Sequence, residues 1–407
     1  MSNPPSAPPA ARVTRHCARF VFIFLVIEFL DEFVFGAREA AWPLIRGDLG
    51  LSYAQVGLLL GIPSIIGNLI EPFLAILGDV WKRRVLVLGG GAVFAVALLV
   101  TALSRDFGLL LASFVLFYPA SGAFVSLSQA TLMDLQPSRR EHNMARWTFA
   151  GSVGVVGGPL VLGAAVLLGF DWRGLFAALA VLTFVVLVFV RRVPFKDYAK
   201  GAEGQGALSL KLFSQGLRQA LHALRRGEVW RWLILLEASD LLLDVFLGFL
   251  ALYMVDVAGA SEGQAAVAVA VWTGVGLVGD LLLIPLLERV QGIRYLRVSA
   301  LVVLALFPAF LLAPDFGGKL VLLGALGFFN AGWYAILQAG LYSAMLGQSG
   351  TALAVKNVSG LVAGFIPLAL GLIAQRLSLQ VAMWLLLLGP VALLIGLPRG
   401  KALPADR

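Results

Sequence analysis

Long apolar runs alternate with short polar segments along the chain, from residue 19 to residue 397. Each run is about 20 residues long, which is the length that a helix needs to cross a bilayer. The runs are unbroken, whereas strands of a membrane barrel would alternate apolar and polar residues. The pattern therefore predicts an all-α membrane protein with twelve transmembrane helices, at residues 19–44, 53–77, 84–103, 108–134, 145–168, 173–193, 230–255, 263–286, 295–313, 318–345, 351–374 and 378–397.

The polar segments divide the chain into two units of six helices. The one long polar segment, residues 194–229, is expected to be a cytoplasmic linker with an amphipathic helix at about 208–225. Residues 1–18 are rich in Pro and Ala and are expected to be a disordered tail. The predicted domains are thus an N-terminal bundle at 19–193, a C-terminal bundle at 230–397 and a short C-terminal tail at 398–407.

The distribution of charge supports this topology. Only 13% of the residues are charged, whereas soluble domains carry roughly 25%. If both termini are cytoplasmic, 25 of the 31 Lys and Arg residues fall on the cytoplasmic side, as the positive-inside rule requires. The six others are Arg38, Arg46, Arg105, Arg173, Lys319 and Arg376. We therefore interpret the net charge of +8 as a topology signal of a multi-pass inner-membrane protein, and not as a nucleic-acid-binding surface.

Residues for enzymatic or metal chemistry are scarce. The single cysteine, Cys17, excludes an internal disulfide, and the three histidines lie in predicted tails or loops. No Walker phosphate-binding loop occurs, and the GGG at 89–91 lies inside a predicted helix. We expect no enzyme, no cofactor and no metal site.

The two bundles carry an internal repeat with an offset of 209 residues. Five of the eleven acids before residue 194 meet another acid at this offset. The pairs are Glu28 with Glu237, Asp31 with Asp240, Glu71 with Asp280, Asp79 with Glu288 and Asp106 with Asp315; in addition Gly50, Ser52 and Gln55 meet Gly259, Ser261 and Gln264. Some transporter folds consist of two such parallel repeats, with the substrate site at their interface.

The segment AILGDVWKRR at 75–84 resembles the signature G-x-x-x-D-R-x-G-R-R/K of the major facilitator superfamily. Asp79, Arg83 and Arg84 match its acid and its closing basic pair, whereas Ala75 and Lys82 replace glycines. Through the six-plus-six plan the resemblance covers nearly the whole chain, and it implies two six-helix bundles related by a pseudo-twofold axis. It also implies a loop that joins the two halves on the cytoplasmic face, with the acid near a helix N-terminus. An ordinary positive-inside loop is the alternative interpretation.

The fifth predicted helix contains GSVGVVGGPLVLG, in which Gly154, Gly158, Pro159 and Gly163 resemble the family's antiporter signature G-x-x-x-G-P-x-x-G-G. Small residues four apart let helices approach closely, and proline kinks them. The family places this motif in exporters that exchange a substrate for protons, while plain tight packing is the alternative. Such antiporters carry an arginine in helix 4, four residues before a glycine; here Tyr118 stands at that spacing before Gly122.

Carboxylates inside the predicted helices are the main functional candidates. Glu28, Asp31 and Glu32 share one face of helix 1, Glu237, Asp240 and Asp244 share one face of helix 7, and Glu71 and Asp280 form a further pair. A charge at the bilayer centre costs about 2.5–3.5 kcal/mol, so such acids usually face a cavity or a partner. Because clustered carboxylates repel one another, at least one should hold a proton near neutral pH. We expect Asp31 and Asp240 to be the main proton or cation sites, supported by the others; pairing with Arg38 or a position near helix ends is the alternative.

The family resemblance implies that helices 1, 4, 7 and 10 surround a central cavity. The candidate cavity residues are Phe35, Arg38, Phe124, Gln129, Asn330, Trp333, Tyr334 and Gln338. Aromatic side chains beside carboxylates suit lipophilic or cationic ligands, and packing within the bundle is the alternative.

These observations predict a secondary transporter of the drug/proton antiporter type that works by alternating access. It would export a small lipophilic or cationic compound in exchange for protons. The alternatives are a nutrient importer coupled to protons or a monovalent cation, and a non-transporting sensor or partner subunit, in which the buried acids would be dispensable. The expected partners are the substrate, the coupling ion and the lipid bilayer, and the chain is expected to be a monomer.

Overall fold

The computed structural model describes residues 9–80, 82–135, 139–193, 195, 225–345, 355 and 359–398. In the N-terminal half it contains α1 (Pro9–Leu49), α2 (Tyr53–Val80), α3 (Arg83–Leu103), a fourth span built from α4 (Phe107–Ser121), the π-helical segment η1 (Gly122–Ser126) and α5 (Leu127–Leu135), then α6 (Arg140–Leu167) and α7 (Trp172–Val190).

The C-terminal half repeats this plan. It contains a span built from α9 (Gly227–Asp240), the π-helical segment η4 (Leu241–Val245) and α10 (Phe246–Asp256), then α11 (Glu262–Leu287), α12 (Gly292–Leu312), α13 (Phe316–Asn330) with α14 (Trp333–Ala344), residues 359–363 with α16 (Phe365–Arg376), and α17 (Leu379–Leu385) with α18 (Leu388–Gly396).

The all-helical fold class is confirmed. Among the described residues, ten helical stretches are long and apolar enough to cross a membrane. The two other long stretches are α1 and the span from α9 to α10, which carry five carboxylates each. Residues 208–224 of the predicted linker helix lie outside the described residues.

The first helix begins earlier than predicted. It starts at Pro9, whereas residues 1–18 were expected to be a disordered tail. Proline is favoured in the first helical turn, where its missing N–H would have no intrahelical partner, and the sequence that follows is rich in alanine and arginine.

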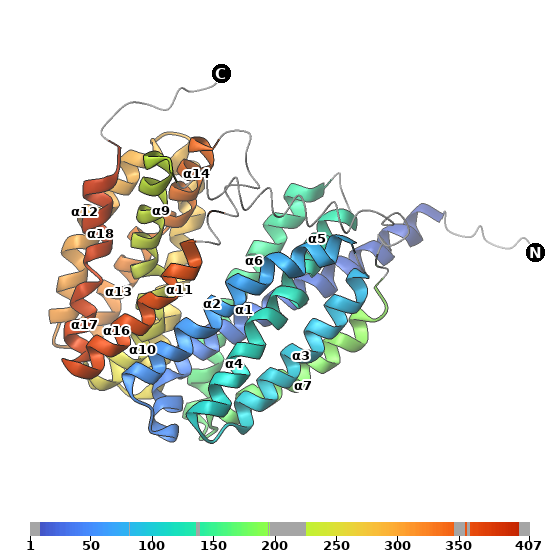
Figure 1. The fold of residues 1–407 in the computed structure, drawn as a ribbon, viewed down its shortest axis with the longest axis horizontal. Helices are drawn as coiled ribbons and strands as arrows, with labels where there is room; N and C mark the ends of the chain where they lie inside the picture. Colours follow the sequence, from blue (N-terminus) through green and yellow to red (C-terminus); the bar gives the residue numbers. More distant parts are fainter. Residues whose placement is uncertain are drawn as a thin grey trace, which may run out of the picture.

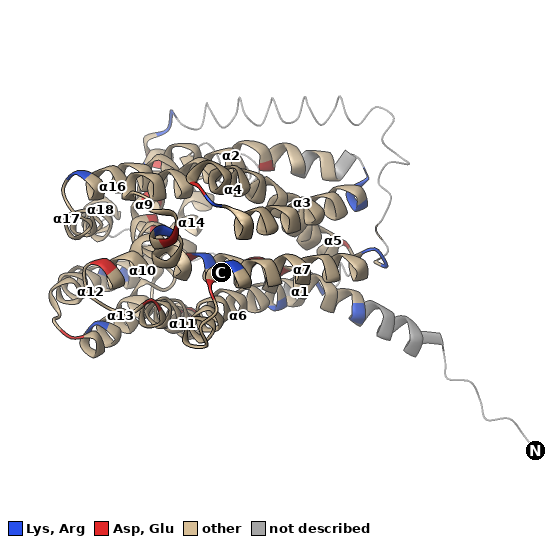
Figure 2. Ribbon diagram, turned by 90° about the horizontal axis from the view of Figure 1, so that it is seen from below, with Lys and Arg blue, Asp and Glu red and all other residues tan. Residues whose placement is uncertain are grey.

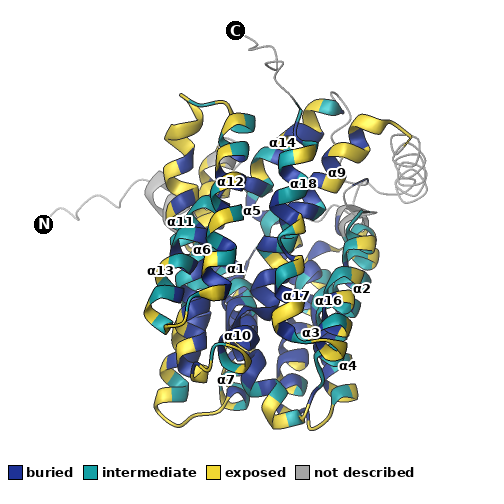
Figure 3. Ribbon diagram, turned by 90° about the vertical axis from the view of Figure 1, so that its left-hand side faces the viewer, coloured by how far each residue is buried: buried dark blue, intermediate teal, exposed yellow. Residues whose placement is uncertain are grey.

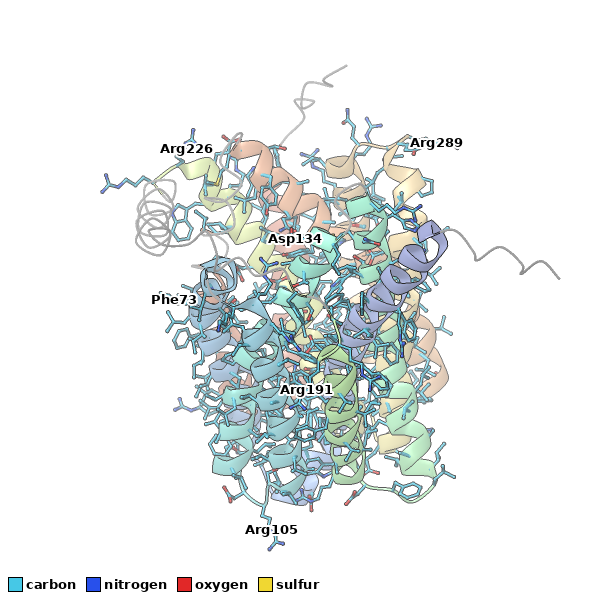
Figure 4. All side chains as sticks on the ribbon, turned by 90° about the vertical axis from the view of Figure 1, so that its right-hand side faces the viewer. Phe73, Arg105, Asp134, Arg191, Arg226 and Arg289 are labelled. Atoms are coloured by element: carbon cyan, nitrogen blue, oxygen red, sulfur yellow. The ribbon has the colours of Figure 1, made fainter. Side chains whose placement is uncertain are left out.

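The helices form two bundles that meet at one end and diverge toward the other (Figure 1). Arg105 lies at one end of the molecule, and Arg226 and Arg289 lie at the opposite end (Figure 4). We call these the far end and the linker end. Arg105, which was predicted on the outer side of the membrane, therefore lies at the opposite end of the molecule from Arg226 and Arg289, which were predicted on the cytoplasmic side.

Duplicated caps explain part of the sequence repeat. At the start of α2 the Ser52 N–H donates to the Gln55 side chain at 2.9 Å, and the Gln55 N–H donates to the Ser52 hydroxyl at 3.2 Å. Ser261 and Gln264 form the same two hydrogen bonds at the start of α11. These capping boxes satisfy free N–H groups at both helix starts. The preceding glycines of the two repeats both have positive φ, 61° and 69°, which glycine adopts without strain.

The core lies between the helices and is densest around α10. Each residue from Phe246 to Met254 is buried, while exposed residues lie on the outer helices (Figure 3). Most of the helical ribbon carries neither acid nor base (Figure 2). The acids that do lie inside the bundles therefore mark the candidate site.

Candidate functional site

Carboxylates in the middle of α1 face α4 and α6. Asp31 accepts a hydrogen bond from the Ser121 hydroxyl at the end of α4, with 2.8 Å between the oxygens. Glu28 is hydrogen-bonded by the buried Trp147 side chain of α6. The i, i+3, i+4 spacing predicts one shared helix face, and in the structure this face is turned toward other helices.

Acids from the two halves lie within electrostatic reach of each other. The Glu32 carboxylate interacts with the charge of Asp31 in its own helix and with that of Asp244 in η4. Asp31 in turn interacts with the charge of Glu71 in α2. Asp244 and Glu71 are exposed, and Asp31 and Glu32 are partly exposed. Together with Glu28 these four acids form a group, which we call the central acid group, and it draws on both halves of the chain.

Of the other three predicted acids, Glu237 and Asp280 bind partners within the C-terminal half. Glu237 of α9 accepts a hydrogen bond from the hydroxyl of Ser359. Asp280 of α11 accepts the backbone N–H of Gly332 at 2.8 Å. Asp240 is the last residue of α9 and is partly buried, directly before η4.

Three of the spans that carry or contact these acids, the fourth, the seventh and the tenth, are interrupted beside them. The π-helical segment η1 follows Ser121 directly, and η4 follows Asp240 directly. In the tenth span α13 ends at Asn330, at the same repeat position as Ser121, and α14 begins at Trp333. Such interruptions leave backbone groups without their helical partner and are frequent at functional sites.

Arg38 is a buried cation in α1. Its guanidinium donates two hydrogen bonds to Glu39, at 2.6 and 3.0 Å, and one to the Tyr118 hydroxyl at 3.1 Å. It also lies 5.1–5.7 Å from the ring centroids of Phe35, Phe114 and Tyr118. Tyr118 stands where the family's antiporters carry an arginine in helix 4, so a cation from helix 1 reaches this position instead.

Phe124 and Trp333 are buried inside their own bundles, which corrects their predicted place on a cavity. The Trp333 indole donates to the Ser299 hydroxyl of α12 at 2.8 Å, and Phe124 packs on Phe94 of α3 with ring centroids 5.7 Å apart. Both side chains have almost no exposed surface. At the same position of each repeat, the aromatic side chain therefore packs against the neighbouring helix.

The other candidate cavity residues differ in exposure. Phe35, Gln129, Tyr334 and Gln338 are partly exposed. Gln129 donates to the Met144 sulfur of α6 at 3.6 Å. Asn330 is buried, and its amide donates to the backbone oxygen of Leu242 in η4 at 3.5 Å. A role of these residues at a cavity stays a prediction.

The segment after α2 is mostly helical, because α2 continues to Val80 and α3 begins at Arg83. Arg83 forms an ion pair with Asp134 of α5 at 2.8 Å, and Arg84 donates to the backbone oxygen of Arg191 at 2.7 Å. These partners belong to the N-terminal half and tie helices of one bundle, and the joining of the two halves by this loop stays a prediction. The side chain of Asp79 lies outside the described residues.

The helix-5 glycines bring α6 against α1. A Cβ atom at Gly158 would lie 2.3 Å from the Phe33 backbone oxygen, and one at Gly154 would lie 2.4 Å from the Phe29 oxygen. Pro159 contacts Gly36 in the same interface, whereas Gly163 faces Ala266 of α11 in the other half. The motif therefore supplies the close approach that small residues permit, and its meaning for export stays a prediction.

Three functional candidates were missed from the sequence. Arg46 of α1 forms an ion pair with Asp256 of α10 at 2.7 Å, and the Tyr53 hydroxyl of α2 donates to the same carboxylate at 2.8 Å. This far-end network joins the halves. Only the assignment of Arg46 to the outer side pointed to this end, because sequence spacing cannot pair residues about 200 positions apart.

Comparison with known proteins gives the identity of this architecture. A sequence model of the Major Facilitator Superfamily matches residues 21–366, from the acidic first helix to the eleventh. The chain belongs to this superfamily. Membership indicates a multi-pass membrane transporter for small molecules, and not an enzyme. A search of curated protein sequences finds no match.

Solved transporter structures share the superfamily fold over almost the whole chain. A mutant of the nucleoside transporter NupG has a TM-score of 0.76 at 14% identity, covering 93% of this chain and 98% of its own. A bacterial homolog of the human lysosomal transporter Spinster, inward-facing and occupied, has a TM-score of 0.69 at 17% identity, covering 97% and 95%. A D-xylose–proton symporter has a TM-score of 0.65 at 15% identity, covering 93% and 97%. These identities support the fold and leave the substrate open.

Proposed function

We propose that this chain is a proton-coupled exporter of small lipophilic or cationic organic compounds. The observation that carries the proposal is the charge interaction between the halves inside the central acid group, where the Glu32 carboxylate of α1 lies within electrostatic reach of Asp244 of η4. The two carboxylates lie on different halves, so the repulsion between them depends on how the halves are placed. Binding of an ion that changes this repulsion is therefore coupled to the position of the halves.

The coupling follows from electrostatic repulsion. With both carboxylates ionised, Glu32 and Asp244 repel each other across the two halves. A proton or a positively charged substrate reduces this repulsion, so the halves can close around either one. The proton and the substrate neutralise the same carboxylates, so binding of one favours release of the other. This competition is the requirement for exchange.

The arrangement of the halves fits an inward-facing state. We place the protein in the inner membrane with both termini in the cytoplasm, so that the linker end, where the bundles diverge, faces the cytoplasm (Figure 1). The far-end network of Arg46, Tyr53 and Asp256 then closes the outer side. Outward opening requires these contacts to break.

The aromatic residues beside the acids favour lipophilic cations. Phe35 is partly exposed one turn from Glu32, and Tyr118 lies one turn before Ser121, which binds Asp31. Aromatic faces next to carboxylates attract cations by stacking and cation–π interaction, and an organic cation would share these two rings with the Arg38 guanidinium.

Import of a nutrient is the second candidate. Tyr118 in place of the helix-4 arginine separates this chain from the antiporter pattern, and the structures of similar fold include a D-xylose–proton symporter. In an importer, substrate and proton would move in the same direction.

The test is transport in proteoliposomes with an imposed pH gradient, with tetraphenylphosphonium as the lipophilic cation and a pH-sensitive dye on the receiving side. An exporter drives the cation and the protons in opposite directions. Glu32→Gln and Asp244→Asn, and likewise Asp31→Asn and Asp240→Asn, should each abolish this coupling while the protein is still made and folded. Asp106→Asn is the matched control, because Asp106 caps α4 at the far end through Leu109 N–H. Full coupled transport in all four test variants would refute the proposal.

A further inference from the structure

The break in the tenth span is held by side chains from two neighbouring helices. Between α13 and α14, the N–H of Gly332 donates to Asp280 of α11 at 2.8 Å. The Tyr295 hydroxyl of α12 donates to the backbone oxygen of Ala331 at 3.0 Å. The Ala331 oxygen and the Gly332 N–H belong to the same peptide group, so this one peptide is bound on both sides.

The backbone at this peptide requires glycine. Gly332 has a φ of 72°, in the left-handed region, and a Cβ atom there would lie 1.9 Å from a Leu283 methyl group. The residues on either side are also fixed, because Asn330 donates to the Leu242 oxygen and Trp333 donates to Ser299. The break is therefore a built feature of the helix.

The fourth span, which is the counterpart of the tenth in the N-terminal repeat, has no such break, and the contacts around it explain the difference. Glu71, the counterpart of Asp280, lies beside Gly122, where a Cβ atom would be 3.0 Å from its carboxylate oxygen. The counterpart of Tyr295 is Leu86, which cannot donate a hydrogen bond. In that half the helix is continuous but π-helical over η1, whereas with both holding groups present the tenth span is split.

We propose that the Ala331–Gly332 peptide is the hinge of the tenth transmembrane span and that Asp280 and Tyr295 hold it as a proton-sensitive clamp. An ionised carboxylate accepts the Gly332 N–H in a charge-assisted hydrogen bond, which is stronger than the bond to a neutral acceptor. A proton on Asp280 weakens this bond and frees α14 to rotate against α13. The functional consequence rests on the proposed function, because it makes Asp280 and Tyr295 positioning residues for proton-coupled movement of the C-terminal bundle.

Among the described residues few other charges bear on Asp280, which is itself exposed. Tyr295 of α12 is the titratable group that interacts with it. Lys319 of α13 is bound to α12 carbonyls near the far end, and Asp256 of α10 is paired with Arg46. On α6 the contact of Gly274 with Val156 places Arg146 about one turn from the level of Asp280, toward the linker end. On α1, the described charged groups are the three acids of the central acid group, the Arg38–Glu39 pair, Arg46 and Asp48, which bind Asp256 and Arg173 at the far end, and Arg19 near the start of the helix.

The test is backbone hydrogen–deuterium exchange of residues 329–336 in the full chain in lipid nanodiscs. At pH 8, Asp280→Ala and Tyr295→Phe should each speed exchange of this segment by about tenfold, the effect of one lost hydrogen bond. Asp280→Asn keeps an acceptor without the charge and should have a smaller but measurable effect. Asp315→Asn is the matched control, because Asp315 caps the start of the same span through Gly318 N–H, and it should change exchange only there.

The pH dependence separates a proton-sensitive clamp from a purely structural one. The ratio of exchange rates between wild type and Asp280→Asn cancels the intrinsic pH effect on amide exchange, and it should approach one as the pH falls from 8 to 5.5. Unchanged exchange in Asp280→Ala and Tyr295→Phe would overturn the clamp, and a ratio independent of pH would overturn its proton sensitivity. Because exchange needs no substrate, this result stands apart from the success or failure of the transport assay.

Discussion

At Arg38 the protein places a guanidinium in its interior and satisfies it almost completely. The side chain is buried with Glu39, at 4% and 2% residue exposure, and the Trp42 indole donates to the second Glu39 oxygen at 3.0 Å. A buried ion pair stabilises little in itself, because desolvation offsets the Coulomb attraction. Each buried charge nevertheless compensates the other, so the loss of one leaves an uncompensated charge in the interior. Glu39 also lies beside Gly248 of α10, at the boundary between the halves.

We therefore expect Arg38→Met to lower the free energy of unfolding by about 3–5 kcal/mol, because it leaves the Glu39 carboxylate buried and unpaired. Adding Glu39→Gln to this variant should restore at least half of the loss, since the unpaired charge is removed. Thermal or denaturant unfolding of the purified protein in detergent measures both effects.

The control for the Arg38 variants is an exposed ion pair of the same kind. Arg173 and Asp48 lie 2.7 Å apart at the far end with side-chain exposures of 27% and 46%. Arg173→Met should cost less than about 1 kcal/mol, because solvent screens such pairs. Equal losses for Arg38→Met and Arg173→Met would show that burial does not set the importance of the Arg38 pair.

At the scale of helices, the interface between α1 and α6 sets the position of the central acid group. Gly158→Ala should lower the stability by about 2 kcal/mol or more, because the new methyl group would meet the Phe33 oxygen at 2.3 Å and the Ala37 nitrogen at 2.4 Å. These are backbone atoms and can move only with the helix. The neighbouring Gly157→Ala is the matched control, since its methyl group would meet only the Phe33 ring, at 3.4 Å. A melting temperature equally unchanged in both variants would contradict this account of the motif.

The helices and their caps were predictable from the sequence because local patterns determine them. Apolar runs of bilayer length gave the spans, and the repeat of Ser52 and Gln55 at Ser261 and Gln264 recurs as two capping boxes of the same geometry. The i, i+3, i+4 spacing also placed Glu28 and Asp31 on one face correctly. In each case the relevant partners lie within one helical turn or one repeat.

The direction in which a helix face points was less predictable, because lipid and bundle interior are both apolar. Phe124 and Trp333 have the residue type of a ligand-binding aromatic, yet they pack toward α3 and α12. The interruptions of the fourth, seventh and tenth spans were missed too. They depend on side chains from other helices, such as Tyr295 and Asp280. Apart from Gly332, the local sequence does not predict an irregular backbone at these positions.

At the scale of the whole molecule, the two halves touch through α1, α2 and α6 on one side and α10, α11 and α16 on the other. A Cβ atom at Gly61 would lie 2.3 Å from the Gly364 oxygen, and Tyr53 N–H donates to the Gln375 side chain at 3.1 Å. Glycine permits backbone contact here without interlocking side chains, while the Arg46–Asp256 pair adds polar bonds that water can replace. The interface is thus suited to separating as two rigid surfaces.

A reversible covalent link across this interface tests whether its separation is required for transport. A Cβ atom at Gly163 of α6 would lie 3.4 Å from the Ala266 Cβ of α11, close to the separation of about 3.8 Å found in disulfides. In a Cys17→Ser background, Gly163→Cys with Ala266→Cys should form a disulfide on mild oxidation, because nothing else crowds that position. The bond would hold the far end closed and should stop transport in proteoliposomes, and a reducing agent should restore it. Each single cysteine variant should transport regardless of oxidation. Undiminished transport by the fully oxidised double variant would show that the halves need not part at this end, and alternating access by rocking of the two bundles would then be wrong for this protein.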